Sequence, residues 1–165
     1  MALAAAVRPG AQVVELGPGT GPVTKALIGA GVRERDLVLI ETNPRFVDLL
    51  RQRFPAATVL EEDAFAAIAR FAEAGMTLTA IVSSLPLMVF PRRRRRRLAM
   101  DALRALGPHG RLVQFTYGPV SPIPLDPALI AEPSRHIWNN LPPAVAWTYQ
   151  HAFGYNDPQV RAEHP

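Results

Sequence analysis

The sequence predicts an α/β fold in which a mostly parallel sheet carries helices on both of its faces. Short apolar runs alternate with helix-like segments along most of the 165 residues, a pattern typical of βαβ units. The first apolar run, at 12–16, ends in a glycine-rich turn that opens a helix-like segment, the usual layout of a ligand site after a first parallel strand. Apolar residues make up 48% of the chain, so a full core and a single domain over 1–165 are expected.

The elements follow in chain order. Runs rich in Val, Leu and Ile predict strands at about 12–16, 37–40, 57–60, 78–83 and 111–117. Helices are expected at about 22–30, 44–54 and 64–74. A fourth helix is expected to run from an arginine-rich segment to about 106, where Pro108-His109-Gly110 ends it.

The C-terminal part of the chain has a different pattern. Five prolines from 119 to 133 predict an irregular loop. Two β-rich stretches, joined around Pro142-Pro143, predict an antiparallel hairpin at the edge of the sheet: Arg135–Leu141 and Ala144–His151. The last residues, about 157–165, are expected to be loose.

Residues 15–21 have the pattern E-x-G-x-G-x-G. Glycines at 17, 19 and 21 let the backbone approach a ligand without Cβ clashes. The acidic residue, Glu15, favours S-adenosylmethionine over a dinucleotide, because S-adenosylmethionine has no pyrophosphate and carries cationic sulfonium and ammonium groups. The alternative is a glycine-rich turn that binds no ligand.

Two further acidic residues end the next two predicted strands. Glu41 lies 20 residues after Gly21, close to the spacing at which a carboxylate reaches the ribose hydroxyls of a cofactor. Asp63 follows the third strand, where a carboxylate can accept a hydrogen bond from the adenine amine. Each residue also has a simpler interpretation, which is to cap the helix that begins after it.

Positive charge is concentrated in one segment. The net charge is +4, and Arg92–Arg97 are six consecutive arginines. They suit an anionic membrane surface or nucleic acid phosphates, or they form a solvated face paired with local acids. The chain has no cysteine, so no disulfide and no metal site are expected. No apolar run reaches the ~20 residues of a membrane span, and the cytoplasm is the expected compartment.

Four segments together resemble the bacterial phospholipid N-methyltransferases, a branch of the class I S-adenosylmethionine-dependent methyltransferases: Val14–Gly21, Ser83–Leu87, Gln114–Pro119 and Asn140–Ala144. The resemblance implies a seven-stranded sheet whose last hairpin is antiparallel. It also implies methylation of the headgroup amine of phosphatidylethanolamine, up to three times, to give phosphatidylcholine and S-adenosylhomocysteine. The related rRNA adenine dimethyltransferases supply the main alternative.

The segment after the fourth strand favours the lipid. Methylases of exocyclic base amines use Asn/Asp-Pro-Pro-Tyr or Asn-Leu-Pro-Tyr there, and the aromatic ring stacks on the flipped base. Here Ser84 stands at the Asn/Asp position and Leu87 at the aromatic position. Leucine cannot stack on a purine, whereas an aliphatic amine needs no stacking. An RNA adenine or small-molecule methyltransferase, and a non-catalytic binding domain, are the alternatives.

The predicted site combines these segments. The candidate catalytic residues are Ser84 and Tyr117, the latter at the end of strand five, where its hydroxyl or its ring would contact the headgroup. The expected cofactor-binding residues are Glu15, Gly17, Pro18, Gly19, Thr20, Gly21, Glu41, Thr42, Asp63, Ala64 and Ser83.

The expected partners are a phospholipid and the anionic inner face of the cell membrane, with Arg92–Arg97 as the contact. No nucleic acid partner is expected, and the chain is expected to be a peripheral monomer. The amphipathic N-terminal helix of the resembled family is expected to be absent, because only about a dozen residues precede the first strand.

Overall fold

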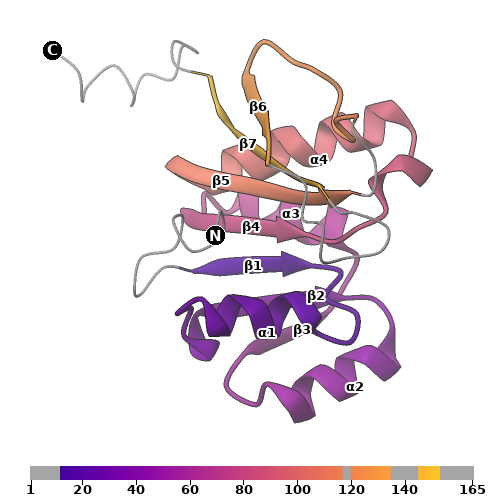
Figure 1. Cartoon of the computed structure of the whole chain (residues 1–165), viewed down its shortest axis with the longest axis vertical. Coiled ribbons are helices and arrows are strands. Elements are labelled where there is room, and N and C mark those ends of the chain that lie inside the picture. The colour runs from indigo at the N-terminus through magenta and orange to yellow at the C-terminus, as the bar shows by residue number, and fades with distance from the viewer. Residues whose placement is uncertain (1–11, 117–119, 135–144, 153–165) are drawn as a thin grey trace, which may run out of the picture.

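A seven-stranded sheet with the order β3-β2-β1-β4-β5-β7-β6 runs through the computed structural model (Figure 1). The structure describes residues 12–116, 120–134 and 145–152. The strands are β1 (Val13–Leu16), β2 (Leu37–Glu41), β3 (Thr58–Glu61), β4 (Leu78–Ser83), β5 (Leu106–Thr116), β6 (Leu129–Pro133) and β7 (Val145–His151). The helices are α1 (Pro22–Gly29), α2 (Pro44–Arg53), α3 (Ala64–Glu73) and α4 (Arg92–Ala105), with 3₁₀ turns η2 (Glu34–Asp36) and η3 (Leu87–Val89).

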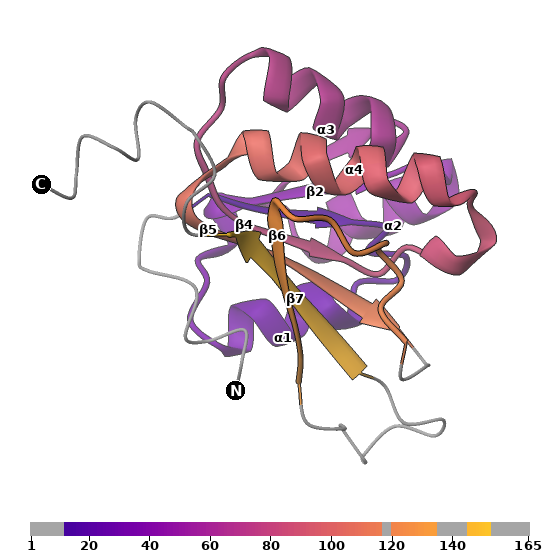
Figure 2. The same cartoon turned by 90° about the horizontal axis from the view of Figure 1, so that it is seen from above.

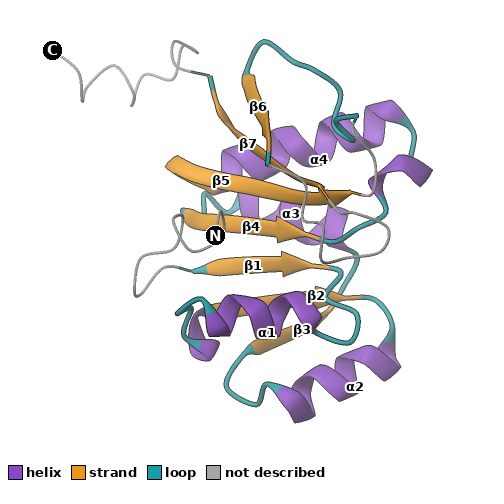
Figure 3. Cartoon of the chain, in the orientation of Figure 1, coloured by secondary structure: helices purple, strands orange, loops and turns teal. Residues whose placement is uncertain are grey.

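Strand β1 lies at the point where the strand order reverses. It pairs in parallel with β2 on one side and with β4 on the other, while β7 runs antiparallel to both β5 and β6. A reversal of this kind leaves a crevice at the carboxyl ends of the parallel strands, where ligands bind. The arrowheads of β1 and β4 point to this edge in Figure 1, and Figure 3 shows the β1–α1 and β4–α4 loops emerging there.

Different helices cover the two faces of the sheet. Successive strand residues point to opposite faces, and the core divides accordingly. Val13 belongs to a buried cluster with Leu27 of α1, whereas Val14 belongs to one with Ile68 of α3 and Leu98 of α4. Figure 2 shows α3 and α4 on one side of the sheet and α1 on the other. The predicted α/β arrangement, with helices on both faces, is confirmed.

The predicted boundaries agree with the observed ones to within one residue from β1 to the end of α4. Strand β5 differs, because it begins at Leu106 and not at 111. The Pro108-His109-Gly110 segment, which was expected to end the helix, lies inside this strand. The pairing register shifts there, between Leu78 and Ala80 of β4, and such an irregularity admits proline and glycine into a strand.

The hairpin prediction was right for β7 and wrong for the position of its partner. Strand β6 is Leu129–Pro133, which falls inside the segment predicted to be an irregular loop. The predicted strand Arg135–Leu141 lies outside the described residues. Among the described strands β6 is at the edge and pairs with β7 alone, and an edge position tolerates the proline at its end. None of the described helices is both long and apolar enough to cross a bilayer.

Candidate active site

Glu15 of β1 is completely buried beneath the glycine-rich loop. Its Oε2 accepts a hydrogen bond of 2.7 Å from the Thr24 hydroxyl in α1, while its Oε1 has no partner among the described residues. Burial raises the pKa of this carboxyl from 4.5 to about 7, against the opposing effect of the Thr24 hydrogen bond. A cation placed beside Oε1 would favour the ionised form and give this atom a partner.

The glycine-rich loop between β1 and α1 needs its glycines for two different reasons. Gly21 has φ +85°, and a Cβ there would lie 2.6 Å from Cε2 of Phe54. Gly19 has φ +56°, and a Cβ there would meet nothing within 4 Å. Packing against Phe54 therefore requires a glycine at position 21, whereas Gly19 lies beside open space that a ligand can use.

Glu41, at the end of β2, holds the glycine-rich loop in place. Its Oε2 accepts from the Gly19 amide at 3.0 Å. Its Oε1 accepts from the amides of Thr42 and Asn43, both at 2.9 Å. A carboxylate has about four acceptor positions, so these three donors leave one for a ribose hydroxyl, and release of Gly19 would free a second. The helix-capping alternative is wrong for this residue, because Asn43 caps α2 through its own side chain.

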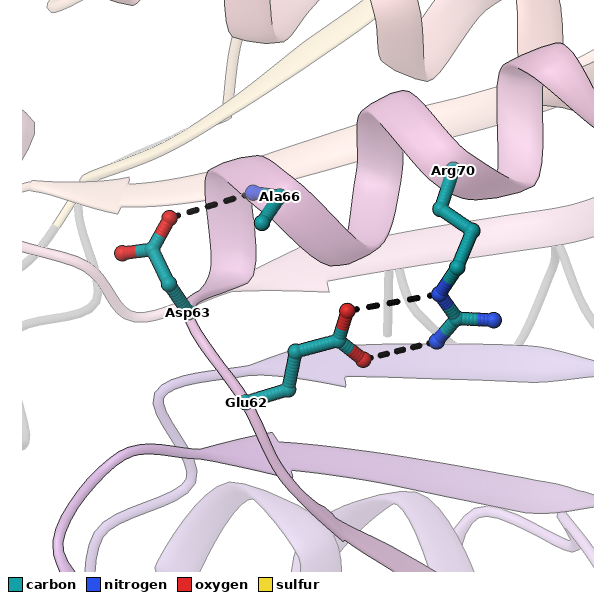
Figure 4. Close-up of polar contacts among 4 residues, drawn as sticks. All are labelled: Glu62, Asp63, Ala66 and Arg70. Atoms are coloured by element: carbon teal, nitrogen blue, oxygen red, sulfur yellow. Dashed lines mark hydrogen bonds and ion pairs between the residues drawn. The ribbon is translucent and has the colours of Figure 1, made fainter.

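Asp63 caps α3, as the simpler interpretation of this residue held. Its Oδ1 accepts from the Ala66 amide at 3.1 Å, and Figure 4 shows this cap next to the Glu62–Arg70 ion pair. Its Oδ2 lies 3.6 Å from Nη2 of Arg94, and half of its side chain is exposed. The contact with the adenine amine stays a prediction.

The other predicted cofactor residues lie along the same edge. The Pro18 carbonyl accepts from the Gly21 amide at 2.8 Å and closes the loop. Thr20 and Thr42 are exposed at the loop surfaces, whereas Ala64 is buried as the first residue of α3. Ser83 ends β4 and is fully buried.

The chain that leaves β4 passes directly over the glycine-rich loop. The Ser84 amide donates to the Leu16 carbonyl at 3.0 Å, and a Cβ on Gly17 would lie 2.9 Å from Cδ2 of Leu85. The Ser84 hydroxyl is buried without a partner in the described part of the chain. The structure therefore brings this candidate catalytic residue next to the cofactor loop. Tyr117, the other candidate, lies outside the described residues.

Gln114 of β5 opens a segment that carries the family resemblance but was not among the predicted site residues, and the structure places it against the loop after β4. It is 1% exposed, and its amide donates to the Leu85 carbonyl at 2.9 Å and to its neighbour Phe115. The Leu85 carbonyl also accepts from the Leu87 amide, so both of its lone pairs are occupied. The amide of Gln114 thus fixes the loop that follows β4. A buried polar residue in a central strand is the signal that identifies it.

Leu87, at the position where base methylases carry an aromatic ring, is part of the core. It opens η3, is 2% exposed, and belongs to the buried cluster beneath α3 and α4. Its side chain is therefore a core side chain, with no aromatic face to offer a base. A flipped adenine would find no stacking partner at this position.

The residues present fit S-adenosylmethionine. Glu15 Oε1, which meets no hydrogen-bond partner within the described segments, suits a cationic group. Glu41 retains acceptor capacity for a ribose, and the space beside Gly19 is open. All three lie at the carboxyl ends of β1 and β2, where the fold places its ligands.

Comparison with solved structures identifies the fold. The structure superposes on an rRNA methylase from Streptococcus thermophilus with a TM-score of 0.66 and 15% identity, covering 90% of this chain and 91% of the other. It superposes on magnesium protoporphyrin IX methyltransferase of Synechocystis PCC 6803, with bound S-adenosylmethionine, with a TM-score of 0.62 and 12% identity, covering 87% and 71%. The chain has the fold of the class I S-adenosylmethionine-dependent methyltransferases.

Two curated proteins are similar in sequence. Ornithine lipid N-methyltransferase of Singulisphaera acidiphila is 33% identical over 111 residues, covering 65% of this chain and 58% of the relative. A chloroplastic ribosomal RNA small subunit methyltransferase of Arabidopsis thaliana is 42% identical over 66 residues, covering 38% and 18%. The chain thus spans less than two thirds of the length of either relative. No protein-family model matches it.

Proposed function

We propose that the protein binds S-adenosylmethionine at the carboxyl ends of β1 to β4 and methylates the headgroup amine of a membrane lipid. Phosphatidylethanolamine is the proposed substrate and phosphatidylcholine the end product. The observation that carries the proposal is the loop after β4. It places the buried Ser84 hydroxyl, which has no partner among the residues described, beside the cofactor loop, and it buries Leu87 where a base methylase presents an aromatic ring.

The chain's own residues provide position more than acid–base chemistry. When bound, S-adenosylmethionine would supply an electrophilic methyl carbon for attack by an amine lone pair, and the electrons of the breaking C–S bond would pass to sulfur. Glu15 and Glu41 would fix the cofactor, and Gln114 would hold the β4 loop against it. Holding two reactants in near-attack geometry accounts for a large part of such a rate enhancement. The amine must reach the site as the free base, and solvent can take its proton.

Two features support a lipid amine over a nucleobase. The Singulisphaera relative, the more extensively aligned of the two curated proteins, is an ornithine lipid N-methyltransferase, so its substrate is also an aminolipid. In addition, a primary aliphatic amine needs no stacking surface, which agrees with the buried position of Leu87. The same relative makes ornithine lipid the second candidate substrate.

Methyl transfer from labelled S-adenosylmethionine tests the proposal directly. Phosphatidylethanolamine, ornithine lipid and a structured ribosomal RNA would be offered separately, with the Glu41→Ala variant as the cofactor-defective control. We expect label on phosphatidylethanolamine as mono-, di- and trimethylated products. Label on ornithine lipid alone would move the substrate to that aminolipid. Label on RNA alone would overturn the proposal in favour of a base methylase.

A further inference from the structure

The large apolar side chains that the described residues expose are confined to two short segments. They are Met88 and Val89 in η3 and Val120 and Leu125 after β5, with exposures of 58%, 74%, 68% and 84%. Elsewhere in the described chain such side chains are covered. Exposed apolar side chains that gather in one place mark an interaction surface, whereas scattered ones need no explanation.

The first turns of α4 join these two segments into one surface. Nη1 of Arg95 lies 3.1 Å from the sulfur of Met88 and donates to the Pro122 carbonyl at 2.6 Å. Arg96 forms an ion pair of 2.6 Å with Asp126, directly after Leu125. Both segments are therefore anchored to the same end of α4, the end near the arrowheads of β1 and β4 in Figure 1. We name Met88, Val89, Val120 and Leu125 the apolar rim.

The six arginines divide into four groups by their contacts. Arg94 lies over the rings of Phe65 and Phe90, at 4.1 and 5.0 Å. Arg95 and Arg96 hold the segment after β5, as described above, and Arg97 is 3.7 Å from Asp101.

Arg92 and Arg93 are the remaining two arginines. Both are exposed, and neither has a partner in the part of the chain that the structure describes.

Arg92 lies on the side of α4 that faces the apolar rim, because it precedes Arg95 and Arg96, which hold the rim segments, by three and four residues. Arg93 instead lines the groove between α4 and α3. Helical side chains tilt toward the N-terminus of their helix, and α4 begins with these two residues. Their charges oppose the positive end of the helix dipole, and α4 has neither a side-chain cap nor an acid in its first turn. An anionic surface opposite Arg92 would relieve part of this repulsion.

We propose that the apolar rim and Arg92 form a docking surface for an anionic lipid bilayer. The rim would enter the interfacial region of the leaflet, while Arg92 contacts lipid phosphates, the combination by which peripheral proteins bind membranes. The surface adjoins the loop after β4, so docking would bring a headgroup to the candidate site. This inference rests on the proposed lipid substrate, but binding can be measured without turnover.

Vesicle sedimentation of the full chain tests the surface. We expect the protein to bind vesicles of equal parts phosphatidylglycerol and phosphatidylcholine more tightly than pure phosphatidylcholine, with binding that weakens as salt rises. Arg92→Glu is expected to weaken binding about fivefold or more. The matched control is Arg35→Glu in η2, an exposed arginine before β2. It makes the same charge reversal at the edge of the sheet where the parallel strands begin. Equal losses in the two variants would overturn the proposal.

The apolar half of the surface needs its own variant. Val89→Gln with Leu125→Gln is expected to reduce vesicle binding while leaving the thermal unfolding midpoint unchanged, because both side chains are exposed. Unchanged vesicle binding in this variant would overturn the proposal. The proposal would also be overturned if the wild type bound RNA but no vesicles and the variant lost the RNA binding. That result would assign the surface to nucleic acid.

A soluble substrate separates this inference from the proposed function. The rim variants should methylate a monomeric short-chain aminolipid at the wild-type rate while losing activity on vesicles. If the wild type binds vesicles as expected but methylates no lipid, the docking surface stands and the proposed substrate fails. If the variants lose the short-chain activity as well, the rim belongs to the catalytic site and the proposal of a separate docking surface is overturned.

Discussion

The carboxylate of Glu41 accepts a hydrogen bond of 3.0 Å from the Gly19 amide, although 22 residues separate them in the chain. This bond ties the end of β2 to the middle of the glycine-rich loop. The residue expected to bind the ribose therefore also shapes the loop that receives the rest of the cofactor. Loop shape and ribose recognition depend on one side chain.

Replacing Glu41 with alanine should weaken S-adenosylmethionine binding at least tenfold, about 1.4 kcal/mol, because the charge-assisted ribose contacts are lost. The three amides that it accepts from would also lose their partner, at a loss of about 1 kcal/mol or more in unfolding free energy. Calorimetry and urea denaturation measure the two effects. Glu61→Ala, at the exposed end of the neighbouring β3, is the control. Equal affinities in the two variants would contradict the ribose role.

Glu15 should make the stability of the protein fall as pH rises from 4.5 to about 7. The folded state holds this proton with a pKa of about 7, against 4.5 in the unfolded chain, so in this window the folded state binds more protons. The effect reaches at most about 3 kcal/mol. Glu15→Gln stays neutral and should flatten the profile. Urea denaturation between pH 5 and 8 measures this, and parallel profiles for the two proteins would refute it.

Gly21→Ala should destabilise the protein by about 2–3 kcal/mol, because its Cβ meets the buried Phe54 ring in addition to the strain of a positive φ. Gly31→Ala is the matched comparison, since Gly31 has φ +101° and a Cβ there would meet nothing within 4 Å. Strain alone should amount to about 1 kcal/mol in that variant. Thermal or urea unfolding of both variants gives the difference, and equal losses would show that the Phe54 contact is unimportant.

Gln114→Glu should destabilise the protein by about 2–4 kcal/mol, because a buried acceptor would face the carbonyls of Leu85 and Phe115. Gln114→Leu removes the amide without introducing a charge and should be milder. In the milder variant we expect a lower methyl-transfer rate with S-adenosylmethionine affinity retained, since Glu15 and Glu41 are untouched. An affinity loss equal to the rate loss would mean that Gln114 acts on the cofactor loop.

Tyr117 stays a predicted catalytic residue, and two variants distinguish its possible roles. Tyr117→Phe removes the hydroxyl and keeps the ring, whereas Tyr117→Ala removes both. A loss of turnover in both variants indicates contact through the hydroxyl, and a loss in the alanine variant alone indicates contact between the ring and the cationic amine. Full turnover in both would make Tyr117 a structural residue.

The parallel half of the fold could be predicted because local signals and tertiary packing agree there. Asn43 and Asp63 mark helix starts, and the apolar runs before them have no competing turn signals. Strand β6 could not be predicted, because Leu129–Pro133 forms a strand only through its pairing with β7. Its proline locally favours a loop, and it is compatible with a strand here because β6 is an edge strand, where one side needs no backbone donor.

The positions of the candidate site residues in the fold could be predicted from the sequence, but their hydrogen-bond partners could not. Sequence spacing placed Glu15 and Glu41 near the carboxyl ends of β1 and β2, and their role in cofactor binding stays a prediction. Spacing does not show which donors a carboxylate meets once the chain is folded. Thr24 reaches Glu15 because α1 turns back over β1, and Gln114 reaches Leu85 across the β4–β5 pair.

The reversal of strand order at β1 makes the site a composite of two separable halves. Apart from Ser83 of β4, everything proposed to hold the cofactor comes from β1 to β3 and the segments directly after them, and everything proposed to meet the acceptor comes from the chain beyond Ser83. Exchange of the β4–α4 loop and the segment after β5 for those of another protein of this fold would therefore redirect the transferred methyl group. The donor pocket would pass unchanged into such a chimaera, so the acceptor preference of this chain can evolve, or be engineered, without rebuilding the part that supplies the methyl group.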